Sequence, residues 1–435
     1  MVLGKHTMKL VIVGAGSSVF TMRLAGDILS ESSMEGGEIA LVDIDPVALS
    51  QAQAGVQMLV EYAKKPFTVT THKQYLTALP DADFVFLTYA IGGIRAWKKD
   101  IEISTAFGVN QSVGDTIGPG AVIRTLRTVP FTMRLVHDME KLCPKAYVIN
   151  YVNPEGAQCL AIEKYSSIRA FGLCHGTPDT AEDLARDVFR VDPSRFIYEA
   201  AGVNHLTWFT RMSIDGKDVY PELRNALIQS GFAEKEPISF ALYDCFSLYP
   251  APGDRHVGEF FSTFLRDNVM HKNDYTWKNN DFLAVEQWRR EGEERLHKAL
   301  RGEDLEYFLQ GSGETATHFI RALITNEVAR EMVNMRNHGY IRNISDGITV
   351  EVPAYIDAFG LKCVDMNTLP DGIAAKCEML GREYQLLVDA AVHCDKRLAL
   401  QVMYLDPLCA NCDDPPGLLD ALIDGNRNYL PQDWN

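Results

Sequence analysis

The chain has 435 residues, of which 46% are hydrophobic and 23% charged, an ordinary globular composition for a protein long enough to form two domains. Its net charge of −16 at pH 7 argues against nucleic acid or an anionic membrane as a partner, because both favour a basic surface. The sequence contains no run of about 18 apolar residues, so no membrane-spanning helix is predicted. Nine cysteines without disulfide-framework spacing predict free thiols in a reducing cytoplasm.

The first predicted strand, residues 9–13, runs into a glycine turn that is followed by a helix. This order is the context that a dinucleotide-binding fingerprint requires. Gly14 permits the tight turn, Gly16 lets the backbone approach a pyrophosphate, and the helix N-terminus offers free N–H groups. Val19 stands where the full pattern has its third glycine. We expect cofactor contacts from Gly14, Gly16, Ser17, Ser18, Val19 and Phe20.

Asp43 ends the second predicted strand, residues 39–43. A carboxylate at this point would hydrogen-bond the ribose of NAD, which favours NAD over NADP. The alternative is that Asp43 forms a turn with Asp45. Asn150, at the end of a later predicted strand (148–150), is a further expected cofactor contact.

Alternating strands and helices continue to residue 173 and predict an α/β fold, a Rossmann-type doubly wound parallel sheet. Beyond residue 200 two strand-like runs precede mainly helical stretches, which include 315–336 and 372–404. We therefore predict an NAD-binding domain over 8–200 and an α+β domain over 201–435 for substrate, metal and oligomerisation. The acidic, proline-containing tail from residue 413 is expected to be a surface segment.

Four polar clusters lie at strand ends or in glycine loops: 150–154, 174–175, 202–205 and 253–259. Within them, Cys174 and His205 are competent transition-metal ligands. Two ligands cannot close a structural zinc site, but they could hold a catalytic metal whose other positions take substrate and water. The alternative is an inert buried thiol beside an ordinary histidine.

These clusters, together with Gly14-Ala15-Gly16-Ser17 and the glycine loop 114–120, resemble glycoside hydrolase family 4 over nearly the whole chain. The resemblance implies a lactate/malate dehydrogenase-like fold, catalytic NAD, and Mn²⁺ (or Co²⁺, Ni²⁺ or Fe²⁺) held by Cys174 and His205. It also implies a homodimer or homotetramer. The reaction that it implies departs from the usual two-carboxylate glycosidase scheme: sugar C3 is oxidised, C2 is deprotonated, the aglycone is eliminated, water adds, and the hydride returns with retention.

The resemblance also implies residue roles. Asp254 would be the base, Asp115 the acid or a hydroxyl ligand, and Asn153 and His175 substrate contacts. The alternatives are a helix cap for Asp254, turn formation for Asp115 and Asn153, and a solvent-facing ring for His175.

The sequence Cys174-His175-Gly176 resembles the members that act on unphosphorylated α-glycosides, and the α-glucuronidase subgroup among them. A uronate substrate would need a cation, which Arg255, Arg95 or Lys98 could supply, while α-glucosides and α-galactosides stay open. Two other classes compete with this interpretation. A 2-hydroxyacid dehydrogenase would consume NAD stoichiometrically, and a non-catalytic NAD sensor would need no metal.

Overall fold

The computed structural model describes residues 8–17, 20–265, 282–432 and 434. Its N-terminal half contains β1 (Met8–Val13), α1 (Phe20–Ser30), β2 (Gly37–Val42), α2 (Pro46–Ala63), β3 (Phe67–His72), β4 (Phe84–Leu87), α3 (Gly93–Ala106), α4 (Gly118–Leu142), β5 (Tyr147–Asn150), α5 (Glu155–Tyr165), β6 (Arg169–Gly172) and α6 (Gly176–Asp183). The strands of this half are parallel and lie in the order 3-2-1-4-5-6, which is typical of Rossmann folds. The predicted doubly wound sheet is thus confirmed.

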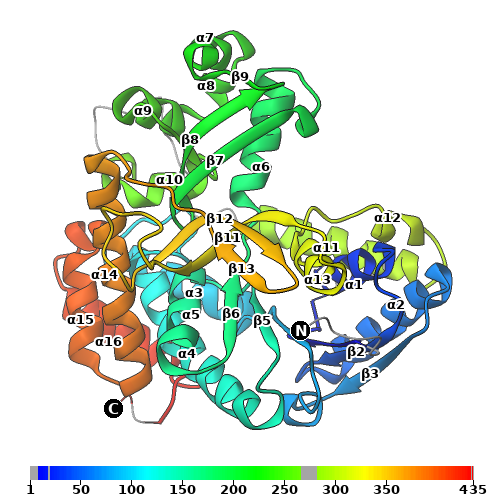
Figure 1. Ribbon diagram of the computed structural model, residues 1–435. Coiled ribbons are helices and arrows are strands. Elements are labelled where there is room, and N and C mark those ends of the chain that lie inside the picture. The colour runs from blue at the N-terminus through cyan, green and yellow to red at the C-terminus, as the bar shows by residue number, and fades with distance from the viewer. Residues whose placement is uncertain (1–7, 18–19, 266–281, 433, 435) are drawn as a thin grey trace.

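The second half extends the same sheet instead of starting another. It contains β7 (Phe196–Val203), β8 (Leu206–Ile214), β9 (Lys217–Asp218), α7 (Tyr220–Ser230), α8 (Phe232–Lys235), α9 (Pro237–Phe246), β10 (Tyr249–Ala251), α10 (Asp254–Val257), α11 (Phe282–Ala299), α12 (Leu305–Leu309), α13 (Ala316–Thr325), β11 (Ala329–Arg336), β12 (Thr349–Asp357), β13 (Gly360–Cys363), α14 (Asp371–His393), α15 (Lys396–Leu405) and α16 (Pro415–Asn426). β11 pairs antiparallel with β6, and β12 and β7 follow it across the sheet. The hairpin of β7 and β8 rises above the sheet with α7 to α9, while α14 to α16 flank one side (Figure 1).

The register of these central strands aligns the ends of two distant segments. Gly172 at the end of β6 pairs with Asn334, Asn334 pairs with Glu351, and Glu351 pairs with Gly202 near the end of β7. The polar clusters that follow β6 and β7 therefore leave the sheet from one row. This places the predicted clusters at 174–175 and 202–205 in the same region.

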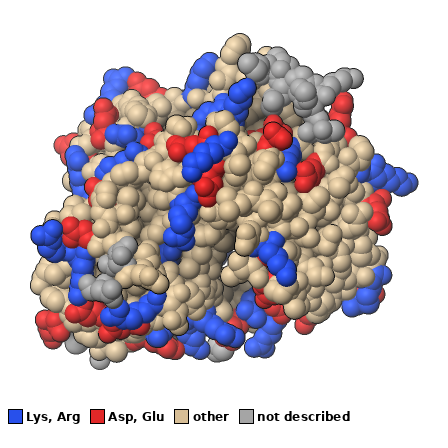
Figure 2. Space-filling model, turned by 90° about the horizontal axis from the view of Figure 1, so that it is seen from below, with Lys and Arg blue, Asp and Glu red and all other residues tan. Residues whose placement is uncertain are grey.

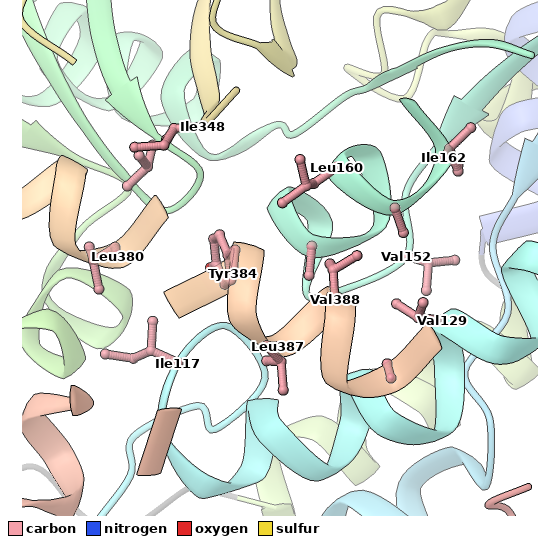
Figure 3. Close-up of a cluster of buried hydrophobic side chains, with 14 of the residues drawn as sticks. Ile117, Val129, Val152, Leu160, Ile162, Ile348, Leu380, Tyr384, Leu387 and Val388 are labelled. Carbon is pink, nitrogen blue, oxygen red and sulfur yellow. The ribbon is translucent and has the colours of Figure 1, made fainter. Parts of the chain in front are cut away.

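Apolar packing fixes the Asp115 segment beneath the C-terminal helices. Ile117 lies in a buried cluster to which α4, α5 and α14 contribute (Figure 3). Tyr384 of α14 projects into this cluster, and its hydroxyl donates to the Thr116 carbonyl at 3.0 Å. The backbone around Asp115 is therefore held from the C-terminal half of the chain.

Two expectations for the C-terminal half are wrong. Residues 315–336 are not one helical stretch, because α13 ends at Thr325 and β11 is inserted between β6 and β12. The tail is not a surface segment either. Asp414 caps α16 by accepting the Gly417 N–H, and one face of this helix is buried against α3, α4 and α15. That face consists of Leu418, Leu419, Leu422 and Ile423.

Among the described residues, no helix has the length and apolar character needed to cross a membrane. Basic and acidic side chains are interspersed on the face seen from below, with no large patch of one sign (Figure 2).

A buried ion pair between α3 and α4 is hydrogen-bonded by Asn426 of α16. Arg127 and Asp100 have side chains 1% and 0% exposed, their charged atoms lie 2.7 Å apart, and the Asn426 amide donates to Asp100 at 2.9 Å. Arg127→Met leaves the Asp100 charge uncompensated, so we expect the free energy of unfolding to fall by about 3–5 kcal/mol. Denaturant titration followed by circular dichroism measures this. Arg195→Met, which breaks an exposed pair with Asp215, is the control and should change little.

Candidate active site

The glycine turn has the geometry that the sequence predicts. Gly14 has a φ of +97°, and a Cβ there would lie 2.6 Å from the Tyr89 backbone, so only glycine fits. The Gly16 N–H donates to Asp43 at 2.7 Å, which brings the expected ribose acid to the turn. Asp43 also accepts the Asp45 N–H at 2.9 Å, so the turn-forming alternative describes a real contact as well.

Of the other residues predicted to contact the cofactor, some make local hydrogen bonds and others lie outside the described residues. Ser17 accepts the Phe20 N–H at 3.3 Å, at the start of α1, whereas Ser18 and Val19 lie outside the described residues. Asn150 is buried and hydrogen-bonds both backbone groups of Val152. It shapes the chain that leads to Asn153, and its contact with a cofactor stays a prediction.

Asp115, His205 and His256 converge in the described structure. One ligand atom of each lies within 4.8 Å of the others, and the rings of His205 and His256 are 4.3 Å apart between centroids. The loop before α4 presents Asp115, the turn after β7 presents His205, and α10 presents His256. His256 was not predicted as a ligand from the sequence, although it lies in the 253–259 cluster that drew attention as a whole.

Hydrogen bonds determine which nitrogen of His205 has a lone pair available to bind a cation. The Thr116 hydroxyl donates to Asp115 at 3.1 Å, so its oxygen must accept the proton of His205 Nδ1, 2.7 Å away. This tautomer leaves the lone pair of His205 on Nε2, as in many histidine metal ligands. Nδ1 of His256 is buried without a hydrogen-bond partner.

The charges in the cluster also suit a divalent cation. Burial raises the pKa of Asp115, but the Arg124 guanidinium, together with His205, His256 and the Thr116 hydroxyl, more than offsets burial and holds the pKa of this carboxyl below its usual value. Burial lowers the pKa of His205 to about 4 and that of His256 well below its usual range, so both rings are neutral near pH 7. One carboxylate and two neutral imidazoles are ligands that Mn²⁺, Fe²⁺, Co²⁺ and Ni²⁺ accept. The residues present therefore fit such an ion.

Cys174 lies outside this group of three. Burial, followed by the nearby carboxyls of Glu155 and Glu351, raises the pKa of its thiol well above the usual range. Its sulfur accepts the Gly176 N–H at 3.4 Å, and the side chain of Asn204, the neighbour of His205, favours its thiolate. A metal would have to displace the thiol proton on binding. The role of Cys174 as a ligand stays a prediction.

The two predicted hydroxyl-binding residues lie at the edge of the cluster. The Asn153 amide donates to Asp115 at 3.1 Å, and the Arg124 guanidinium donates to the Asn153 carbonyl at 3.0 Å. The side chain of His175 is 61% exposed, and its Nδ1 lies 3.7 Å from a Glu314 oxygen. Arg124 was not predicted from the sequence, because a lone arginine at a helix start carries no motif.

Asp254 caps a helix, as the alternative to its predicted role as a base proposes. Its two carboxylate oxygens accept the N–H groups of Ile238 and Ser239, both at 2.7 Å, in the first turn of α9. A base role would require at least one of these bonds to open, and it stays a prediction.

Two of the predicted cations, Arg95 and Arg255, differ in position. Arg95 is exposed on α3. Arg255 is partly buried beside His256, and its guanidinium carbon lies 5.9 Å from the ring centroid of Trp288. Of the two, Arg255 is the nearer to the cluster along the chain.

Comparison with known proteins gives consistent matches along the chain. A family model described as family 4 glycosyl hydrolase matches residues 9–189, and the model of that family's C-terminal domain matches residues 200–409. An alpha-galactosidase of Bacillus subtilis (strain 168) is 27% identical over 437 residues, 98% of this chain and 99% of that protein. An alpha-galacturonidase of Lachnoclostridium phytofermentans is 29% identical over 465 residues, 98% of each.

Solved structures share the fold. A 6-phospho-alpha-glucosidase from gut microorganisms in complex with NAD and Mn²⁺ superposes with a TM-score of 0.82 at 20% identity, covering 98% of this chain and 99% of that one. A malate dehydrogenase of Cryptosporidium parvum superposes with a TM-score of 0.53 at 15% identity, covering 89% and 100%. The second likeness confirms the predicted dehydrogenase-like architecture.

Proposed function

Because the chain belongs to the family 4 glycosyl hydrolases, we propose that it cleaves α-glycosides of unphosphorylated sugars with the help of bound NAD and a divalent metal, Mn²⁺ first among them. The observation that carries the proposal is the convergence of Asp115, His205 and His256 into one cation-compatible group. The Gly14 turn with Asp43 supplies the dinucleotide part of the same site. The relatives named alpha-galactosidase and alpha-galacturonidase support an α-glycosidic substrate.

Each cofactor has its own place and its own chemistry. The Gly14 turn and Asp43 would hold NAD, and Asp115, His205 and His256 would hold the metal, with Cys174 as a predicted additional ligand. When bound, NAD supplies a reversible hydride acceptor and the metal polarises a substrate oxygen.

The chain's own residues bind and orient the sugar and handle its protons. Asn153 orients Asp115 through its amide, and Arg124 holds the Asn153 backbone. The exposed His175 ring lies beside Glu314, and it is near enough to His205 and His256 to contribute to lowering their pKa values. Asp115 and His175 are thus the side chains best placed to contact substrate hydroxyls, and Asp254 keeps its predicted base role only if it leaves the α9 cap.

A uronide is the substrate that we favour over a neutral hexoside. Four relatives from different bacteria, one of them 29% identical, are named alpha-galacturonidase. Arg124 lies next to Asp115 at the cluster, and Arg255 adjoins His256, so cations are available for a sugar carboxylate. The residue sequence Cys174-His175-Gly176 adds its resemblance to the uronide subgroup.

All nine cysteines are free thiols, which supports our proposal of a cytoplasmic location, where reducing conditions keep a metal-binding thiol available. A homodimer or homotetramer stays a prediction.

The full-length protein, stripped of NAD and metal, tests the proposal. It is assayed on p-nitrophenyl α-glucuronide, α-galacturonide, α-glucoside and α-galactoside with NAD, Mn²⁺ and a reductant added singly and together. We expect p-nitrophenol release only when all are present, and fastest from a uronide. Turnover that survives removal of NAD would contradict the proposal. Net accumulation of NADH in a parallel assay with 2-hydroxyacids such as lactate and malate would instead indicate a 2-hydroxyacid dehydrogenase.

A further inference from the structure

Glu259 is a buried carboxyl beside the cluster for which the reaction as described has no use. It lies in the short helical turn of residues 258–260 that follows α10, and it is 1% exposed. Its Oε1 accepts the N–H groups of Val113 and Gly114, both at 2.8 Å. These two residues directly precede Asp115.

We propose that Glu259 is a positioning residue that holds the Val113–Gly114 backbone so that Asp115 meets His205 and His256. This inference rests on the proposed metal site and deepens it. Glu259 does not touch the group itself, and it acts through the backbone that carries Asp115.

The backbone conformation at Gly114 directs its N–H group to an acceptor on a side chain. Gly114 has a φ of +67°, and a Cβ at this residue would lie 2.2 Å from the Ile101 side chain. In this conformation two successive buried N–H groups point to one place, where a single carboxyl oxygen satisfies both. Without that oxygen, the loop would have to turn its N–H groups toward other acceptors, and Asp115 would turn with it.

The same short segment couples two members of the cluster. His256 precedes Glu259 by three residues, and the Arg255 carbonyl accepts the Ser112 hydroxyl at 2.5 Å. The loop before Asp115 is thus fastened to the His256 segment at Ser112 and again at Val113 and Gly114. His205 joins this arrangement through Thr116, so the separation of all three side chains depends on how the loop is held.

The chemistry of Glu259 identifies its conservative replacement. Burial raises its pKa to about 8, and its second oxygen is buried without a hydrogen-bond partner. A glutamine has the shape of the protonated acid and keeps the accepting oxygen. Leucine has a similar size and no acceptor.

The test measures binding of Mn²⁺ alone to the full-length metal-free protein, by the electron paramagnetic resonance signal of free Mn²⁺. We expect Glu259→Leu to weaken Mn²⁺ binding by about 10-fold to 100-fold, the usual cost of losing a group that orients a ligand, and Glu259→Gln to stay within about threefold. Asn426→Leu is the matched control: it removes a buried polar side chain of α16, so it should lower the melting temperature and leave Mn²⁺ binding unchanged.

Two results would overturn the inference, and they differ in whether the proposed metal site also fails. If Asp115→Asn and His256→Ala lose Mn²⁺ while Glu259→Leu binds it like the wild type, Glu259 only stabilises the fold and the metal site stands. If Asp115→Asn and His256→Ala also bind normally, the proposed metal site is wrong. Should Glu259→Leu not fold, Glu259→Asp, which withdraws the oxygen from both N–H groups, must bind more weakly than Glu259→Gln.

Discussion

Replacing His256 with alanine is expected to weaken Mn²⁺ binding and Mn²⁺-dependent glycoside cleavage by more than about 100-fold, because groups that merely orient a ligand already contribute about 10-fold to 100-fold. His256 supplies one ring nitrogen within 4.8 Å of ligand atoms of Asp115 and His205, and its Nδ1 is buried without a hydrogen-bond partner. Titration of the metal-free protein with Mn²⁺, followed by rates at saturating metal, measures both effects.

Cys174→Ser separates this ligand set from the predicted pair of Cys174 and His205. If the thiol is an additional ligand, both variants bind Mn²⁺ more weakly. A protein that loses Mn²⁺ with Cys174→Ser but keeps it with His256→Ala would assign the metal to the pair instead. Melting temperatures of both variants, measured without metal, exclude a general loss of folding.

The second large effect concerns NAD. Gly14→Ala places a Cβ 2.6 Å from the Tyr89 backbone and keeps a φ of +97°, so the turn must change shape. A left-handed backbone alone costs an L-residue about 1–2 kcal/mol. Since about 1.4 kcal/mol is a factor of ten, we expect NAD affinity to fall at least tenfold. Quenching of protein fluorescence by NAD measures the affinity.

Gly216→Ala is the matched control for this variant. Gly216 has a φ of +80° in the turn between β8 and β9, with no heavy atom within 4 Å of an added Cβ. It tests backbone strain far from the glycine turn along the chain, so its NAD affinity should equal that of the wild type. An unchanged affinity in Gly14→Ala would remove the turn from the cofactor site.

Local patterns predicted the Rossmann half well. The strand, glycine turn and helix at residues 9–29 follow from apolar periodicity and from a backbone that only glycine adopts at Gly14. The tail carries the same kind of signal, although its composition predicts a surface segment, and that prediction is wrong. Asp414 and the prolines after it are the capping residue and first turn of α16, and the leucines behind them form its buried face.

In the candidate site, too, the sequence predicted part of the arrangement and the structure decided the rest. The sequence marked the segment 253–259 as functional, but it could not choose among the residues in it. Asp254 satisfied the resemblance, yet it caps α9, whereas His256 faces His205. Which side chain of a short segment points inward depends on the helix against which the segment packs.

The sequence by itself determined the class of fold, the glycine turn and the family, because each follows from short local patterns and from their order along the chain. Only the tertiary structure decided that Asp115, His205 and His256 meet, since strand register and the bonds from Glu259 bring together segments that are about 50 to 140 residues apart. Pairing of this kind depends on how β6, β11, β12 and β7 align, and no single segment contains that information.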